Sequence, residues 1–319
     1  MPALSKQINW NLLHTFVVIA EAESVSRAAH QLGRGQPAVS AALRKLEEQL
    51  GCRLAERGPT AFTLTDAGRI VYREAREICG SIDRVSTLVT DLSGELTGSV
   101  NLTIASHMTS PLIDRAFAEF HRLHPKATFS TLVMNSPEIM KQMAESLIYF
   151  GIGPVSTLRP EFEYFHIFKE HCGFYCGPTH RLFGVKGLTL ADLENERAIT
   201  YRNAIFSDVL QSITDMRHQA RFADPFVGVS SHMEEVRRMI VAGLGIGPIP
   251  VHVAQRDVRD GFLWRLPPYK DVMPINIYLI TNPRVRPSRS EQAFIDVLKG
   301  IVEATPYEQR VYPLPEQLL

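Results

Sequence analysis

The sequence predicts a multidomain α/β protein with a small helical head, a long linking helix and a larger body of two α/β lobes. Three observations predict this arrangement. The chain has 319 residues, more than a usual single domain. Helical periodicity fills the segment before residue 93, whereas strand-like and helix-like segments alternate after residue 98. A hydrophobic content of 45% and a charged content of 21% are typical of a globular protein and exclude extensive disorder.

The head begins with an amphipathic segment over residues 10–21, whose apolar side chains recur at the spacing of one helix face. Ser24 is a favourable N-cap for a second, short helix, which ends at Gly33. A third helix has Pro37 in its first turn, where the missing N–H costs nothing, and ends at Gly51. Two short helices joined by a tight glycine-containing turn form a helix-turn-helix.

The segment after the third helix predicts two short strands, Arg53–Leu54 and Phe62–Leu64, around the turn residues Gly58 and Pro59. A hairpin in this place is the wing of a winged helix-turn-helix. We therefore predict a winged helix-turn-helix DNA-binding domain over residues 1–66.

Three stretches of the head, SRAAHQL, QPAVSAALRKLEEQLG and LTDAG, lie in this order within residues 16–69. Together they resemble the DNA-binding head of LysR-type transcriptional regulators. Two positions depart from that family, because Gly35 stands where a hydroxyl residue is usual and Ala55 where a bulky aromatic residue is usual. We expect one missing hydrogen bond at Gly35 and looser packing under the wing at Ala55.

The resemblance implies a sequence-specific transcriptional regulator that responds to a small-molecule effector and catalyses no reaction. It implies double-stranded promoter or operator DNA with an interrupted inverted repeat as a partner, and RNA polymerase as a further partner if the protein is an activator. No cofactor, metal or membrane partner is expected. The N-terminus lacks the apolar core of a signal peptide, which predicts a cytoplasmic location.

Candidate DNA contacts lie on the third helix and around it. A helix in the major groove turns its N-terminal half toward the base edges, where Gln36 and Arg44 can form bidentate contacts. The resemblance supports Gln36 and Ser40, and Ala41 replaces a larger polar residue, so Arg44 is expected to carry specificity. The net charge of the chain is zero, but basic residues gather in this stretch and can contact phosphates, with simple solubility as the alternative explanation. The predicted DNA-binding set is Gln36, Pro37, Ser40, Ala41, Arg44, Lys45, Arg27, Arg34, Arg53 and Arg57.

Residues 67–98 are predicted to form a coiled-coil helix followed by a hinge at Gly94 and Gly98. Thr65 and Asp66 supply a cap and an acidic first turn. Apolar residues recur at alternating spacings of four and three, which favours a homodimer through residues 67–95, with a helix packed on its own domain as the alternative. The resemblance extends the dimer to a homotetramer. The seam consists of Val71, Ala75, Ile78, Ile82, Val85, Val89 and Leu92.

Alternating strands and helices over residues 99–304 predict a largely parallel sheet covered by helices on both faces. The chain runs through one lobe, enters a second and returns, which predicts lobe one over residues 99–168 and 270–304 and lobe two over residues 169–269. This order, with the stretch VRRMIVAGLGIGPIP, resembles the periplasmic-binding-protein-like effector domain of the same regulators. Residues 305–319 contain three prolines and are expected to be an extended strap or a disordered end.

Ligands of two-lobed α/β domains bind at the carboxyl ends of strands, beside the free N–H groups of helix N-termini. Hydroxyl and N–H donors at these places favour an anionic effector, and Arg202 between Tyr201 and Asn203 can grip a carboxylate bidentately. The alternatives are simple helix caps for the hydroxyl residues, a surface salt bridge for Arg202 and ordinary polar contacts for the histidines. The predicted effector-binding set is Ser106, His107, Thr109, Ser110, Tyr201, Arg202, Asn203, Ser231 and His232.

Two other classes of function are kept as alternatives. The first is a two-lobed binding protein or enzyme with a helical extension, but no GxSxG elbow, Walker A loop, HExxH or strand-linked GxGxxG motif supports it, and no catalytic residue is assigned. The second is a regulator that responds to oxidation or to a protein partner. Cys172 and Cys176 lie on a predicted strand that separates their Cα atoms by roughly 13 Å, too far for a disulfide, so we expect buried thiols.

Overall fold

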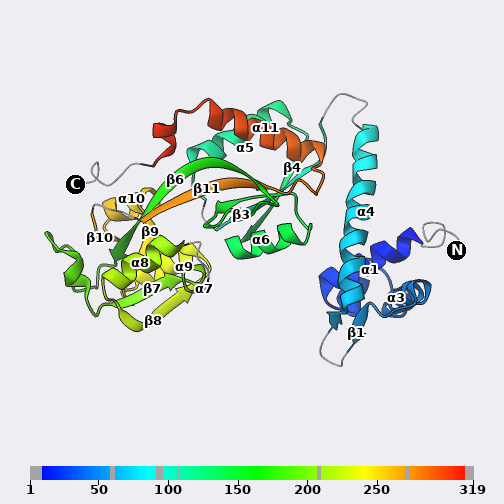
Figure 1. The fold of residues 1–319 in the computed structure, drawn as a ribbon, viewed down its shortest axis with the longest axis horizontal. Helices are drawn as coiled ribbons and strands as arrows, with labels where there is room; N and C mark the ends of the chain where they lie inside the picture. Colours follow the sequence, from blue (N-terminus) through cyan, green and yellow to red (C-terminus); the bar gives the residue numbers. More distant parts are fainter. Residues whose placement is uncertain are drawn as a thin grey trace. The chain divides into compact units, whose positions relative to one another are not determined.

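The computed structural model describes residues 9–57, 62–90, 96–106, 108–206, 210–269 and 273–312. The chain divides into two compact units, a head over Met1–Gly94 and a body over Glu95–Leu319, and Figure 1 labels most of the helices and strands of both. The elements of the head are α1 (Trp10–Ala22), α2 (Val25–Gln31), α3 (Gln36–Leu50), β1 (Ala55–Arg57), β2 (Phe62–Leu64) and α4 (Asp66–Thr90).

One apolar core holds the helices of the head together. Phe16 and Ile19 of α1 belong to the same core cluster as Leu43 and Leu46 of α3, and all four side chains are fully buried. Each such burial contributes about 1.5–3 kcal/mol relative to an exposed side chain. The hydroxyl of Ser24 caps α2 as predicted, and the three expected helices are confirmed.

The wing is the antiparallel pair β1 and β2. Its first strand begins at Ala55, so the strand predicted over Arg53–Leu54 is wrong. The carboxylate of Glu47 in α3 accepts a hydrogen bond from the amide of Leu54 at 2.9 Å, and the carbonyl of Leu54 accepts one from the amide of Thr65 at 3.0 Å. These contacts hold Leu54 against the end of α3, and the pairing between strands starts only after it.

Helix α4 is packed on the head at its start and exposed further along. The amide of Gly68 donates to the hydroxyl of Thr65 at 2.9 Å, which confirms the predicted cap. Ala75 is buried in the head core, whereas Ile78 is 43% exposed and Ile82 is 44% exposed. The predicted seam therefore divides into a part that packs on the head and a part that faces solvent in the single chain. The seam residues whose side chains lie outside the described part of the chain are Val85, Val89 and Leu92.

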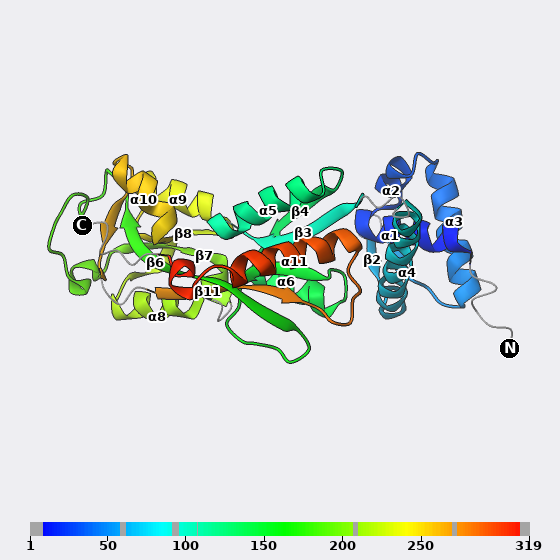
Figure 2. The same ribbon diagram turned by 90° about the horizontal axis from the view of Figure 1, so that it is seen from above.

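One lobe of the body is built on three neighbouring parallel strands, with β3 between β4 and β5. Figures 1 and 2 show α5 and α11 side by side over one face of these strands, and Figure 1 shows α6 on the other face. The elements of this lobe are β3 (Ser99–Ala105), α5 (Pro111–Leu123), β4 (Thr128–Met134), α6 (Ser136–Ala144), β5 (Phe150–Pro154) and α11 (Arg289–Glu303).

The other lobe contains a separate parallel pair, β7 and β8, against which α9 packs. Its elements are the short 3-10 helix η3 (Leu190–Leu193), β7 (Arg197–Tyr201), α7 (Arg202–Phe206), α8 (Gln211–Gln219), β8 (Ala223–Ser230), α9 (Met233–Val241), β9 (Gly247–Pro250), α10 (Val251–Arg259) and β10 (Trp264–Leu266).

Two long strands, β6 (Glu163–Cys176) and β11 (Met273–Thr281), connect the lobes. They pair antiparallel along the whole length of β11, while β5 pairs with β11 and both β9 and β10 pair with the C-terminal half of β6. One sheet therefore passes through both lobes. It is mixed, where the sequence predicted a largely parallel sheet, because β6 leaves the first lobe and β11 returns to it in the opposite direction.

The segment after α11 crosses back over the connecting strands. Arg310, at the end of the short 3-10 helix η5 (Tyr307–Arg310), donates from Nη1 to the carbonyls of His166 and Ile167, each at 3.1 Å. The amide of Tyr312 donates to the carbonyl of Lys169 at 3.0 Å. Within the described residues the C-terminal segment is therefore a strap along β6, one of the two forms predicted for it, and residues 313–319 lie outside that part.

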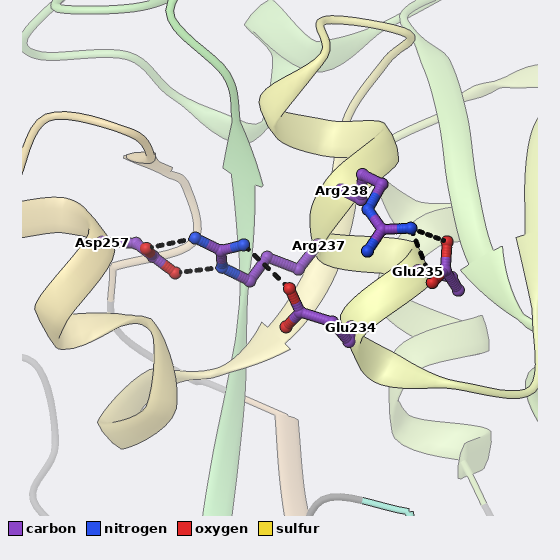
Figure 3. Close-up of polar contacts among 5 residues, drawn as sticks. All are labelled: Glu234, Glu235, Arg237, Arg238 and Asp257. Atoms are coloured by element: carbon purple, nitrogen blue, oxygen red, sulfur yellow. Dashed lines mark hydrogen bonds and ion pairs between the residues drawn. The ribbon is translucent and has the colours of Figure 1, made fainter.

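A bidentate ion pair fixes α9 against α10 in the second lobe (Figure 3). The guanidinium of Arg237 donates from Nε and Nη2 to the carboxylate of Asp257 at 2.5 and 2.6 Å, and from Nη1 to Glu234 at 3.0 Å. These hydrogen bonds, with that to Asp257 foremost, raise the pKa of Arg237. Within the described part of the chain, Arg238 pairs with Glu235, one turn before it on the same helix, and with no other acidic residue.

We predict that Arg237→Lys lowers the free energy of unfolding by about 1 kcal/mol, because an ammonium cannot make the two parallel bonds to Asp257. Arg238→Lys is the matched control and should change stability by less than about 0.5 kcal/mol, since an exposed pair within one helix contributes little. Thermal and urea unfolding of both variants measure this. Equal losses in the two variants would contradict the bridging role of Arg237.

Candidate nucleic-acid interface and ligand cleft

Helix α3 has one face in the core of the head and an opposite face in solvent. Val39, Leu43 and Leu46 are buried on one side of the helix, so the residues on the opposite side face solvent. The predicted base-contacting residues fall on this outer side: Gln36, Pro37, Ala41, Arg44 and Lys45 are exposed, and Ser40 is half-buried. The structure therefore brings the candidate base readers together on one accessible stripe.

The predicted phosphate-contacting residues lie on the segments that flank α3 in the sequence. Arg27 on α2, Arg34 in the turn before α3 and Arg53 after α3 are all exposed. Arg57 ends β1, and its side chain lies outside the described part of the chain. These arginines give the head local positive charge that can attract phosphates, although the net charge of the whole chain is zero.

The two residues that depart from the family pattern have local consequences. Gly35 is the N-cap residue of α3 and supplies no side-chain hydrogen bond to the first turn. Ala55 lines a hollow of about 530 Å³ between the second half of α3 and the start of the wing, together with Arg44 and Arg53. Ala55 itself is buried, at 3% exposed.

A narrow cleft of about 70 Å³ lies between the two lobes of the body. It is at the carboxyl ends of β3 and β7, as expected for a two-lobed α/β domain, and the N-termini of α6 and α9 border it. The lining residues are Ala105, Ser106, Met108, Asn135, Ser136, Pro154, Glu170, Cys172, Tyr201, Leu210, Ile213, Ser231, Met233, Pro250 and Ile275.

The structure brings three of the predicted effector residues together in this cleft: Ser106, Tyr201 and Ser231. The hydroxyl of Tyr201 donates to the carbonyl of Pro248 at 3.0 Å, which fixes its ring. Other residues of the predicted set, all outside the lining, are Thr109, Arg202 and His232, which are exposed, and Ser110, which is buried. His107 and the side chain of Asn203 lie outside the described part of the chain.

Ser110 takes part in a contact that joins the lobes beside the cleft. Its hydroxyl caps α5 and contacts the hydroxyl of Tyr312 from the strap. The ring of Tyr312 stacks on His252 at the start of α10, with centroids 4.4 Å apart. Nε2 of His252 donates to the carbonyl of Thr109 at 3.1 Å, so a residue of each lobe and one of the strap meet here. Burial lowers the pKa of His252, which favours the neutral ring.

Glu170 is a functional candidate that the sequence reasoning did not identify. It lies on β6, is only 3% exposed and lines the cleft. Its Oε2 has no hydrogen-bond partner among the described residues, and Nε2 of His252 lies 3.9 Å from it. Burial raises the pKa of Glu170 to about 8, so the carboxyl group is protonated at neutral pH. No local signal marked it, because Glu170 stands between Lys169 and His171 in a polar part of the strand.

Burial also makes the thiols of β6 unreactive. Cys172 and Cys176 are buried and unpaired, as predicted. Burial raises the pKa of Cys172 well above its usual value and that of Cys176 to about 12, which suppresses the reactive thiolate.

Within the described ranges, no group of three or more histidine, cysteine, aspartate or glutamate residues is placed to hold a metal ion. No helix in those ranges has the length and apolar character needed to span a membrane.

Known protein families match the chain over most of its length. The family described as LysR substrate binding domain matches residues 93–302, and the family described as bacterial regulatory helix-turn-helix protein, lysR family, matches residues 10–69. The HTH-type transcriptional activator BauR of Pseudomonas aeruginosa is 27% identical over 290 residues, which cover 90% of this chain and 93% of the relative.

Solved structures share the fold. Full-length CbnR complexed with its target DNA has a TM-score of 0.64 at 21% identity, and the match covers 92% of this chain and 100% of that one. Full-length LysG from Corynebacterium glutamicum with bound effector Arg has a TM-score of 0.56 at 18% identity, covering 93% of this chain and 99% of that one.

The two family matches agree with the architecture of the described residues. A helix-turn-helix head with an exposed third helix corresponds to the first family, and a two-lobed body with a cleft corresponds to the second. The chain belongs to the LysR family and is a DNA-binding transcriptional regulator with an effector-binding domain.

Proposed function

We propose that the exposed stripe of α3 reads the bases of an operator and that a small anionic molecule in the cleft between the lobes changes this binding. The observation that carries the first half is the division of α3 into a buried face and an outer face bearing Gln36, Ser40 and Arg44. Arginine and glutamine can each form two hydrogen bonds to one base in the major groove. Arg27, Arg34 and Arg53 then contact phosphates, which set the position of the helix.

The second half of the proposal rests on the cleft. Ser106, Ser136 and Ser231 supply hydroxyl groups, and two helix N-termini that border the cleft favour negative charge. A volume of about 70 Å³ is well below the roughly 300–1,000 Å³ of drug-sized pockets, which supports a small effector. Arg202 and the other predicted contacts outside the lining stay predictions. A redox response through Cys172 or Cys176 is disfavoured because both thiols are buried with raised pKa values.

We also propose that two copies pair through the exposed part of α4, so that two heads read the two halves of an interrupted inverted repeat. Ile78 and Ile82 are large apolar side chains of α4 that are exposed in the single chain, and pairing would cover them. A homotetramer, action in the cytoplasm, and contact with RNA polymerase if the protein activates transcription, complete the proposal.

We predict that Arg44→Ala reduces the preference for the protein's own promoter over random DNA by roughly ten- to a hundredfold, because it removes a bidentate base contact. Arg53→Ala should weaken binding to both DNAs alike, since it removes a phosphate contact. It should also reduce the slope of log affinity against log salt concentration by about one. Band-shift titrations at several salt concentrations measure both effects.

The control for both variants is Arg122→Ala, which removes an exposed arginine of the body whose only described pairing is with Glu119. It should leave affinity and specificity unchanged. If Arg44→Ala weakened binding to promoter and random DNA equally, Arg44 would be a phosphate contact and the base-reading assignment would be wrong.

We predict that Ile78→Lys combined with Ile82→Lys at least halves the mass of the assembly in sedimentation equilibrium, because two charges enter an apolar seam. Ile70→Lys is the matched control, since Ile70 is an exposed isoleucine of the same helix that lies off the seam. A double variant that retains the wild-type mass would show that α4 does not pair.

We predict that Ser231→Phe abolishes the response of the promoter to its effector while promoter binding is retained, because the aromatic ring fills the cleft. Ser156→Phe, at an exposed position outside the lining, is the matched control and should respond like the wild type. A reporter fused to the promoter gives the measurement. Full response in the Ser231→Phe variant would place the effector elsewhere.

A further inference from the structure

Glu170 is an unusual group to find at the wall of an otherwise neutral cleft. Its side chain is almost completely buried, its Oε2 has no hydrogen-bond partner, and the strand that carries it is held on both sides by β11 and by the strap. A buried carboxyl group without a partner costs free energy. A ligand that donates a hydrogen bond or carries positive charge would remove this cost.

Among the described residues, no cation in contact with Glu170 already does so. Across the cleft the lining consists of hydroxyl, amide and apolar side chains, and Glu170 is its only ionisable carboxylate among the described residues. His252 lies 3.9 Å from Oε2, beyond hydrogen-bond distance, and its Nε2 proton is already donated to the carbonyl of Thr109. Lys169, the next residue on β6, alternates to the other face of the strand.

The cleft therefore has two chemically different regions. Helices α6 and α9 begin at the cleft, one from each lobe, and His232, the N-cap residue of α9, makes no side-chain hydrogen bond to the first turn, so an anion can accept hydrogen bonds from the first amides of that helix. Glu170 on β6 favours instead a hydrogen-bond donor or a positively charged group. A ligand that satisfies both must carry an anionic group and a donor group within a few bonds of each other, because the space is about 70 Å³.

We propose that the effector is a small amino-carboxylate, whose carboxylate lies at the N-termini of α6 and α9 and whose ammonium group pairs with Glu170. This inference rests on the proposed function, because it assumes that the effector occupies the cleft. It deepens that function by naming the chemical class, and it makes Glu170 the residue that distinguishes an amino acid from the corresponding plain carboxylate.

Pairing with an ammonium group requires Glu170 to lose the proton that it carries in the empty cleft. The protein should then release close to one proton when the ligand binds near pH 7, because the pKa of Glu170 falls from about 8 to below the pH of the solution. The other titratable groups that face Glu170 are His252, Tyr201, Cys172 and Tyr312. Burial favours the neutral form of each, so none of them supplies this proton.

The test uses the full chain and defined probes. Glycine, the common L-amino acids and linear ω-amino acids of two to six carbons are screened by thermal shift beside their deaminated carboxylates. Any compound that stabilises the protein is titrated calorimetrically at pH 7 in phosphate and in Tris, whose ionisation enthalpies differ, so that proton release is measured directly. We expect at least one amino acid to bind at least about tenfold more tightly than its deaminated counterpart.

Glu170→Gln keeps the shape and neutrality of the protonated side chain, so the variant should fold with an unchanged melting temperature. It should lose both the preference of about tenfold for the amino compound and the proton release. Glu163→Gln is the matched control, because Glu163 is an exposed glutamate of the same strand, and it should behave like the wild type.

Three results would overturn the proposal, and they separate it from the proposed function. If a deaminated carboxylate binds as tightly as its amino counterpart and Glu170→Gln changes nothing, while Ser231→Phe still abolishes binding, the effector occupies the cleft but the ammonium contact is wrong. If neither Ser231→Phe nor Glu170→Gln affects binding, the cleft itself is the wrong site. If no amino-carboxylate of the panel stabilises the protein, the assigned chemical class is wrong.

Discussion

The antiparallel pairing of β6 with β11 is the constraint on which the effector-binding body depends. These strands are the connection through which one sheet continues from the first lobe into the second, and β5, β9 and β10 all attach to them. Their register sets Glu170 opposite Ile275, and both side chains line the cleft. A shift of one residue would turn Glu170 to the other face of the sheet, so the chemistry of the cleft follows directly from this pairing.

The strap is bound to β6, one of these two strands. Arg310 and Tyr312 bind carbonyl groups of β6, which places the ring of Tyr312 on His252 and its hydroxyl on Ser110. Ser110 caps the first helix of one lobe, and His252 lies in the first turn of α10 in the other. A change in the spacing of the lobes must therefore alter these contacts, which gives ligand binding a physical route to the packing of the whole body.

Much of the head could be predicted because its signals are local. Ser24, Pro37 and Gly51 determine helix ends within one turn of themselves, and the apolar periodicity between them gives the buried faces. The first wing strand was misplaced because its start depends on the carboxylate of Glu47, which binds the amide of Leu54 seven residues further along. The seam of α4 was read as one continuous stripe, although Ala75 belongs to the core of the head. Periodicity alone does not distinguish these two environments.

The cleft was harder to predict, since it is made by residues far apart in the chain. The positions of Ser106, Tyr201 and Ser231 followed from the rule that ligands bind at strand ends. The role of Ser110 did not, because its partner Tyr312 is 202 residues away in a segment whose structure the sequence left open. Glu170 escaped notice for the same reason: its burial comes from the pairing of two strands and the packing of a third segment, and none of these is visible around position 170.

The central claim is that occupation of the cleft changes how the paired heads bind DNA. Nuclease footprinting of the protein's own promoter, with and without a cleft-binding compound, tests it most directly. The account predicts that the compound changes the length or spacing of the protected regions for the wild type and leaves them unchanged for Ser231→Phe. Identical footprints of the wild type with the cleft empty and occupied would contradict it.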